Sequence, residues 1–193
     1  ENLPKTKPPF ISIRESVILN GGDIIDSYEK KKWDITSEFR NDVLNLWDIC
    51  KKDSTFWNKQ TGKMAGLDKN TNEPENLFIN LKVKPQHKER DVLPDKVFLQ
   101  RLASKKFILD FHYKNDEIEF RYKSLEIKKL LTRAGLILEI YTYITALEIK
   151  NEDAEYYDDI DVGVYADWDR AKNNNDDFGT TNEIDVLLMR DVI

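Results

Sequence analysis

Apolar side chains recur at a spacing of three or four residues in several parts of the chain, and this period predicts amphipathic helices. One helix begins near Thr36, a second, short one at Pro94, and a third at Ser124, whose side chain can cap it. Gly135 marks a break before a fourth helix over 136–149. The apolar positions that define the first three are Phe39, Val43, Leu46, Trp47 and Cys50; Val97, Phe98, Leu99 and Leu102; and Leu125, Ile127, Leu130 and Leu131.

Alternating apolar and polar residues, rich in β-branched and aromatic side chains, predict strands in other parts of the chain. The first alternating run leads into the turn-forming sequence Asn20-Gly21-Gly22-Asp23. Two later runs are joined only by Lys114-Asn115-Asp116, so we expect them to form a hairpin. The predicted strands cover residues 10–19, 77–83, 106–113, 117–122, 161–169 and 182–190.

The segment 53–76 is polar and rich in Lys, Asn and Thr, and we predict a loop there. It contains Gly62-Lys63, which matches the end of a phosphate-binding loop motif. That motif needs an earlier glycine at position 57, where the chain has Trp57. The spacing therefore argues against nucleotide-phosphate binding in this segment.

The order of these elements predicts an α/β (α+β) protein in two parts. A helix, a hairpin and flanking helices favour a small winged-helix-like linking domain over residues 1–123, followed by a second domain over residues 124–193. The chain begins at Glu1 rather than at a methionine and ends at Ile193 within an apolar run. We therefore expect it to be a piece of a longer protein.

The composition, with 40% apolar, 11% aromatic and 34% charged residues, is that of a globular protein with a core. A single cysteine, Cys50, allows neither a disulfide framework nor a cysteine zinc site, and His87 and His112 are too few for a histidine zinc site. No run approaches the roughly 18 apolar residues of a membrane span, and the start does not resemble a signal peptide. We expect a cytoplasmic protein with no membrane association.

The charge is distributed unevenly along the chain. Residues 81–134 carry 14 basic and 8 acidic side chains, a net charge of +6, whereas residues 135–193 carry 4 basic and 15 acidic side chains, a net charge of −11. Excess carboxylate is the reverse of a nucleic-acid footprint, but it provides the oxygen ligands that hard divalent cations need. The neighbouring basic segment could hold phosphate.

One carboxylate, Glu139, lies within the helix predicted over 136–149, which is apolar on nearly every face and therefore predicted to be buried. A carboxylate in such surroundings is costly unless it is paired, protonated or bound to a metal. The alternative is that Glu139 lies on a narrow exposed stripe of the helix, together with Thr142 and Ala146.

Two further carboxylates, Glu183 and Asp185, are two residues apart on the last predicted strand, so they point to the same face. Positions two apart on a strand are separated by roughly 6.8 Å, and both side chains can approach one cation or its waters. A helix with one carboxylate packed on a hairpin with another could thus hold Mg²⁺ or Mn²⁺ for hydrolysis of a phosphodiester.

Three segments near the end of the chain follow one another in a recognisable order. They are Gly135-Leu-Ile-Leu-Glu-Ile-Tyr-Thr-Tyr143, a strand that ends in Trp168-Asp169, and Thr181-Asn-Glu-Ile-Asp-Val-Leu-Leu-Met-Arg190. Together they resemble the nuclease domain of CRISPR ancillary nucleases activated by cyclic oligoadenylate. In that family a CARF sensor domain precedes a linking domain and a restriction-endonuclease-like domain of the PD-(D/E)-x-K type, usually in a homodimer. The resemblance covers residues 124–193 and, in general layout, the rest. It implies an antiviral hydrolase of type III CRISPR defence.

By this resemblance Glu139 and Asp185 are catalytic residues that ligate Mn²⁺ or Mg²⁺, and Glu183 is an acidic neighbour in the catalytic site. The family's lysine strand would begin just after Ile193, so the second domain is a truncated restriction-endonuclease-like core, incomplete at its C-terminus. The sensor domain is also missing, and cyclic oligoadenylate would bind only there. The resemblance implies that the chain as given is inactive by itself.

Three functions compete at this point. The first is a divalent-metal-dependent endonuclease that cleaves single-stranded RNA or DNA when the full protein binds cyclic oligoadenylate, with segment 81–134 guiding phosphate. The second is a non-catalytic module that binds nucleic acid through a basic face of Lys128, Lys129 and Arg133. The third is a dimerisation or structural module in which the C-terminal carboxylates only promote solubility.

Overall fold

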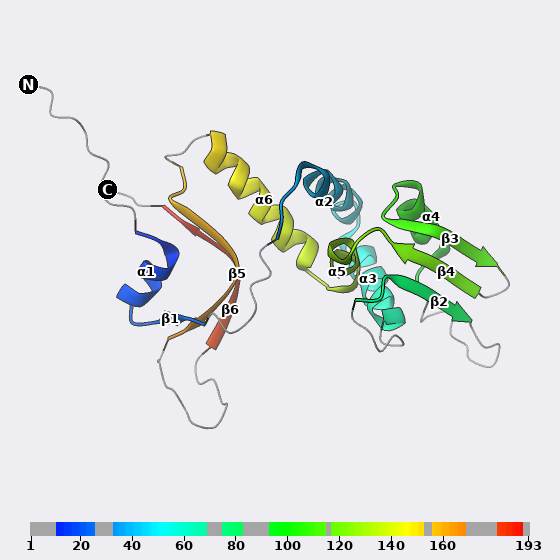
Figure 1. Ribbon diagram of the computed structural model, residues 1–193, viewed down its shortest axis with the longest axis horizontal. Helices are drawn as coiled ribbons and strands as arrows, with labels where there is room; N and C mark the ends of the chain where they lie inside the picture. The colour runs from blue at the N-terminus through cyan, green and yellow to red at the C-terminus, as the bar shows by residue number, and fades with distance from the viewer. Residues whose placement is uncertain are drawn as a thin grey trace, which may run out of the picture. The chain divides into compact units, whose positions relative to one another are not determined.

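The computed structural model forms six helices and six strands in the residues that it describes, and the strands make two antiparallel three-stranded sheets (Figure 1). The α+β class is therefore confirmed. The chain divides into two compact units, with unit 1 made of residues 1–36 and 139–193 and unit 2 of residues 37–138. The described residues are 11–25, 33–68, 75–82, 93–114, 117–152, 156–168 and 181–190.

These compact units do not coincide with the two predicted domains, 1–123 and 124–193. The difference arises because the N-terminal strand pairs with a C-terminal strand, Ile24 facing Ala166, so the start of the chain belongs to the same unit as its end. The boundary between unit 2 and the second segment of unit 1 falls within the helix that begins at Leu136.

Unit 2 contains one sheet, in the order β2-β4-β3, and four helices. The predicted hairpin is confirmed, and the predicted strand 77–83 joins it on the far side of β4, so β4 is the central strand. The elements are α2 (Ser37–Cys50), α3 (Ser54–Asp68), β2 (Phe78–Lys82), α4 (Lys96–Ser104), β3 (Ile108–Lys114), β4 (Glu117–Tyr122) and α5 (Leu125–Thr132).

The helix starts in unit 2 follow the capping chemistry of the sequence. Ser124 caps α5, its hydroxyl accepting a hydrogen bond from Ile127 N at 3.3 Å. Asp95 caps α4 by accepting from Phe98 N at 3.0 Å, so that helix begins after Asp95 rather than at Pro94. The core of the unit is formed by apolar side chains that the periodicity identified, among them Val43, Leu46, Leu99, Leu102, Ile118, Phe120, Ile127 and Leu130.

The loop predicted over 53–76 is wrong for residues 54–68, which form α3. Asp53 starts this helix by accepting a hydrogen bond from Phe56 N at 2.8 Å. The buried face of α3 consists of Trp57, Gln60, Thr61, Met64 and Leu67, and the polar residues within it hide the helical period from a search for apolar positions. Gly62-Lys63 lies inside this helix and not in a phosphate-binding loop.

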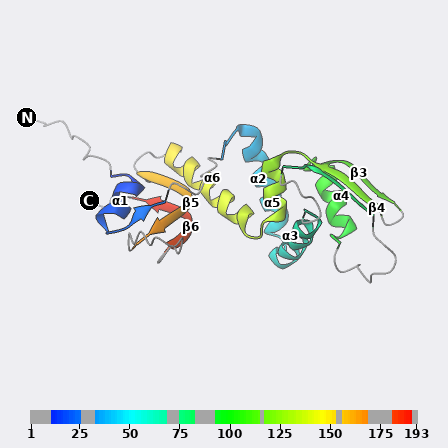
Figure 2. The same ribbon diagram turned by 60° about the horizontal axis from the view of Figure 1, so that its bottom comes forward.

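Unit 1 is built on the sheet β1-β5-β6, with β1 (Asp23–Ile24), β5 (Asp159–Asp167) and β6 (Thr181–Met189). Helix α1 (Ile13–Leu19) lies on one face of this sheet and α6 (Leu136–Glu152) lies along the other, as both views show (Figures 1 and 2). The core under α1 contains Ile13, Val17, Ile24, Val164 and Ala166.

The strand predicted over 10–19 is also wrong, because residues 13–19 form α1. A capping box explains the helix: Ser12 Oγ accepts a hydrogen bond from Glu15 N at 3.2 Å, and the Glu15 carboxylate accepts one from Ser12 N at 2.8 Å. Ile13 and Val17, four residues apart, then face the sheet together. The turn predicted at residues 20–23 is present, and Gly21 has a φ of +91°.

Candidate metal centre

The first turn of α6 positions Glu139. Gly135, with a φ of +84°, separates α5 from α6, and its carbonyl oxygen accepts a hydrogen bond from Leu138 N at 2.9 Å. Ile137 and Ile140 on either side of Glu139 are buried. Glu139 itself is half-buried and Leu138 is 53% exposed, so the prediction that this helix is buried on nearly every face is wrong at its start.

The Glu139 side chain reaches the middle of strand β5. Its Oε1 atom lies 3.8 Å from the place where a Cβ atom on Gly163 would be. Gly163 has a left-handed backbone, with a φ of +62°. The carboxylate therefore lies over a residue that has no side chain.

The strand register places Asp185 opposite this glycine. Val162 pairs with Val186 and Val164 with Ile184, so Gly163 and Asp185 occupy the facing positions between these two pairs. Ile184 packs against the core under α1. Regular alternation from Ile184 would put Asp185, the next residue, on the face that α6 covers. Glu139 and Asp185 thus approach the same part of the sheet from a helix and a strand.

Glu183, the residue before Ile184, lies on the face away from the core under α1. It pairs with Tyr165, two residues farther along β5 than Gly163. Both Glu183 and Asp185 are exposed. No set of three His, Cys, Asp or Glu side chains that could hold a metal ion occurs within the described ranges. Mg²⁺ keeps several waters and can bind a protein through one or two carboxylates. A magnesium site made of Glu139 and Asp185 stays a prediction.

The rest of α6 follows β5 toward its start. Lys150 Nζ donates a hydrogen bond to the carbonyl oxygen of Asp158 at 2.6 Å. Burial raises the pKa of Tyr143, one helical turn after Glu139, and the negative charges of Asp161 and Asp159 raise it further. Tyr143 is therefore a protonated hydroxyl at neutral pH. Sequence reasoning did not single out Gly163, and a glycine inside a strand is the signal that could have identified it.

The basic face predicted for the competing binding function is only partly present. Lys128 is 2% exposed and its Nζ atom donates a hydrogen bond to the carbonyl oxygen of Asn76 at 2.7 Å. This lysine ties α5 to the segment before β2 and is not available to a phosphate, so its predicted role is wrong. Lys129 is half-buried and Arg133 is exposed.

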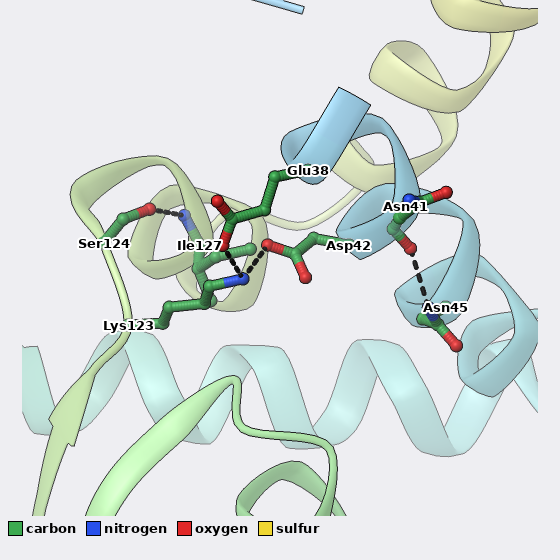
Figure 3. A network of polar contacts seen from close by, with 7 residues as sticks. All are labelled: Glu38, Asn41, Asp42, Asn45, Lys123, Ser124 and Ile127. Carbon is green, nitrogen blue, oxygen red and sulfur yellow. Dashed lines mark hydrogen bonds and ion pairs between the residues drawn. The ribbon is translucent and has the colours of Figure 1, made fainter. Parts of the chain in front are cut away.

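A second lysine of the basic segment is engaged in a polar network. Lys123 Nζ lies 2.8 Å from Glu38 Oε1 and donates a hydrogen bond to Asp42 Oδ2 at 2.5 Å (Figure 3). Both carboxylates come from α2, so this network joins α2 to the junction of β4 and α5. Like Lys128, Lys123 serves the packing of unit 2.

No helix within the described ranges is both long and apolar enough to cross a membrane.

Comparison with known proteins gives similarity of structure alone, since no protein-family model and no curated protein sequence matches the chain. The crystal structure of protein VC1899 from Vibrio cholerae is similar with a TM-score of 0.59 at 13% identity, over 92% of this chain and 40% of that one. Can2 from Sulfobacillus thermosulfidooxidans, solved in complex with cyclic tetra-adenylate, gives a TM-score of 0.47 at 13% identity, over 93% of this chain and 38% of that one. The chain spans less than half the length of either protein, and it shares the fold of the matching part of VC1899.

Proposed function

We propose that this chain carries the metal-binding part of a divalent-metal-dependent endonuclease that cleaves single-stranded RNA or DNA. The observation that carries the proposal is the position of the Glu139 carboxylate over Gly163, the residue that faces Asp185 across the β5–β6 pair.

Glu139 and Asp185 would hold the cation, and Glu183 would add negative charge beside it. Bound Mg²⁺ or Mn²⁺ supplies positive charge that stabilises the charge developing on a phosphodiester during hydrolysis. Glu139 is half-buried in the first turn of α6, where its carboxylate is partly shielded from water. The dimeric assembly and activation by cyclic oligoadenylate through a separate sensor domain, in type III CRISPR defence, belong to this same proposal.

The test compares metal binding and cleavage in the natural full-length protein and in three variants. Glu139→Gln and Asp185→Asn remove one charge each with little change in volume. Glu152→Gln, at the exposed end of the same helix α6, is the matched control. Binding is measured by titration with Mn²⁺, and cleavage is measured on labelled single-stranded RNA and DNA with and without cyclic oligoadenylate.

We expect Glu139→Gln and Asp185→Asn each to weaken Mn²⁺ binding at least about tenfold and to abolish cleavage, because each removes a direct ligand and losing even an outer partner costs 10- to 100-fold. Glu152→Gln should behave as wild type, and EDTA should stop cleavage. Cleavage that persists in both site variants would show that the site is misassigned.

A second candidate, a non-catalytic nucleic-acid-binding module, is favoured by the topology of unit 2, in which a hairpin and a third strand pack with helices as in winged-helix proteins. Binding that never leads to cleavage under any metal condition would support it. With Lys128 buried, exposed Arg133 is the residue to test: Arg133→Ala should weaken nucleic-acid binding and reduce its salt dependence if unit 2 holds phosphate.

A further inference from the structure

The residues of the β5–β6 pair that face α1 are even-numbered at one end of the pair and odd-numbered at the other. At one end Val164 and Ile184, which pair with each other, belong to the core under α1. At the other end Met189 packs on the same core, and Asp159, its partner, accepts a hydrogen bond from Ile13 N of α1 at 2.9 Å.

Regular alternation does not allow this arrangement. Ile184 and Leu187 are three residues apart on one strand, and residues an odd number apart point to opposite faces, yet both pack on the core under α1. The same holds for Asp159 and Val164 on β5, which are five residues apart. The alternation must therefore reverse between these positions on both strands.

Gly163 lies at the point of reversal. Its φ of +62° is in the left-handed region, where a residue with a side chain is strained, and it faces Asp185. On β6 the reversal falls between Ile184 and Leu187, in the stretch that contains Asp185 and Val186. On β5 it puts Val162 on the opposite face from Val164.

We infer that Gly163 is a positioning residue of the proposed metal site, an inference that rests on the proposed function. Its left-handed backbone allows Ile184, Leu187 and Met189 to pack on one core while Asp185 points toward Glu139. With regular alternation, burial of Leu187 and Met189 would turn Asp185 toward the core under α1, away from Glu139. An added Cβ would meet the Glu139 carboxylate at an ordinary contact distance of 3.8 Å, so the need for glycine comes from the backbone angle.

The test measures the proximity of positions 139 and 185 without metal or catalysis. Glu139→Cys and Asp185→Cys are combined, and the rate of crosslinking by a short bifunctional maleimide is recorded; the native Cys50 is buried, and the chain without the two new cysteines gives the background. The pair is placed in three backgrounds: Gly163, Gly163→Ala and Gly21→Ala. Gly21 is the matched control, since it has a φ of +91° in the same unit but has nothing within 4 Å of an added Cβ.

We expect rapid crosslinking with Gly163 and with Gly21→Ala, and crosslinking about tenfold slower with Gly163→Ala, because a left-handed alanine is strained and the backbone would move to an extended conformation. Gly163→Asn should restore most of the rate, since asparagine tolerates left-handed angles better than alanine. Circular dichroism and thermal unfolding establish that each variant is folded.

Several results would overturn the inference: equal rates with Gly163 and Gly163→Ala, no crosslink in the Gly163 background, or a rate lost equally with Gly21→Ala. Unfolding of both Gly163 variants would make this glycine a folding residue and would also overturn it. Because the readout needs no metal, failure of the proposed nuclease function would appear separately. In that case the double cysteine variant would crosslink, whereas the wild-type protein would bind no Mn²⁺.

Discussion

Gly22 is a residue for which space, rather than backbone angle, dictates the choice of amino acid. A Cβ atom added there would lie 2.8 Å from Trp168 Cε3, 3.0 Å from Val17 Cγ1 and 3.1 Å from the carbonyl oxygen of Asp167. Real Cβ atoms essentially never make the first of these contacts, and the other two are tighter than most. Two of the three atoms belong to a rigid ring and to the backbone. Gly22 thus lets the turn after α1 approach the end of β5.

We predict that Gly22→Ala lowers the free energy of unfolding by about 1–3 kcal/mol, the usual cost of forcing a methyl group into a packed region. Urea denaturation followed by fluorescence measures the change, and Trp168 provides a local probe. The control is Gly62→Ala, where an added Cβ meets nothing within 4 Å inside helix α3. There the substitution should stabilise the protein by about 0.5–1 kcal/mol, so a destabilised Gly62→Ala together with a neutral Gly22→Ala would contradict the packing argument.

At the scale of elements, the network around Lys123 connects a helix with a strand-to-helix junction distant in sequence (Figure 3). Burial by itself would lower the pKa of Lys123, but its hydrogen bonds to Asp42 and Glu38 outweigh this effect and raise the pKa above its ordinary 10.5. The hydrogen bond from Lys123 and the lysine's charge lower the pKa of Glu38 below its ordinary 4.5. Both groups are therefore more stable charged in the folded protein than in the unfolded chain.

These directions set the pH dependence of the network. The stabilisation from Glu38 is present above pH 4.5 and is lost as the pH falls through its lowered pKa. That from Lys123 is present below pH 10.5 and is lost as the pH rises through its raised pKa. We predict that Lys123→Met lowers the unfolding temperature between these limits, and that the difference from wild type shrinks outside them.

Thermal unfolding measured across the pH range checks this prediction, with Lys52→Met, an exposed lysine just after α2, as the control. A difference between Lys123→Met and wild type that stays constant from acid to alkaline pH would mean that the lysine contributes through its packing and not through its charge.

At the scale of the molecule, the chain forms one continuous and one discontinuous unit. Unit 2, residues 37–138, has its own sheet and its own buried residues, including Leu46, Trp57, Leu99 and Phe120. Unit 1 needs both ends of the chain, because β1 pairs with β5 and α1 covers the core of that sheet.

We therefore predict that residues 37–138 expressed alone fold and unfold cooperatively, since a compact unit with its own core can fold independently. Circular dichroism during heating and amide hydrogen exchange measure this. The shorter segment 37–114, which lacks the central strand β4, should show no cooperative transition. If 37–138 also lacks one, the units depend on each other for stability.

Local signals predicted much of unit 2 correctly. Ser124 caps a helix, and the apolar spacing in α2 and the hairpin sequence around residues 108–122 led to the observed elements, because each of these signals acts within a few residues. They failed for α1, where alternation over ten residues obscured the four-residue spacing of Ile13 and Val17, and for α3, whose buried face includes Gln60 and Thr61.

The sequence by itself determined the α+β class, most helix and strand positions, and the choice of Glu139, Glu183 and Asp185 as candidate site residues. Only the tertiary structure decided that Glu139 lies over Gly163 opposite Asp185, that Lys128 is buried, and that the chain's start pairs with its end. The reason is that capping and periodicity depend on neighbours along the chain. Burial, strand register and the direction of a carboxylate depend on residues far apart in sequence, and here also on a backbone reversal at a single glycine.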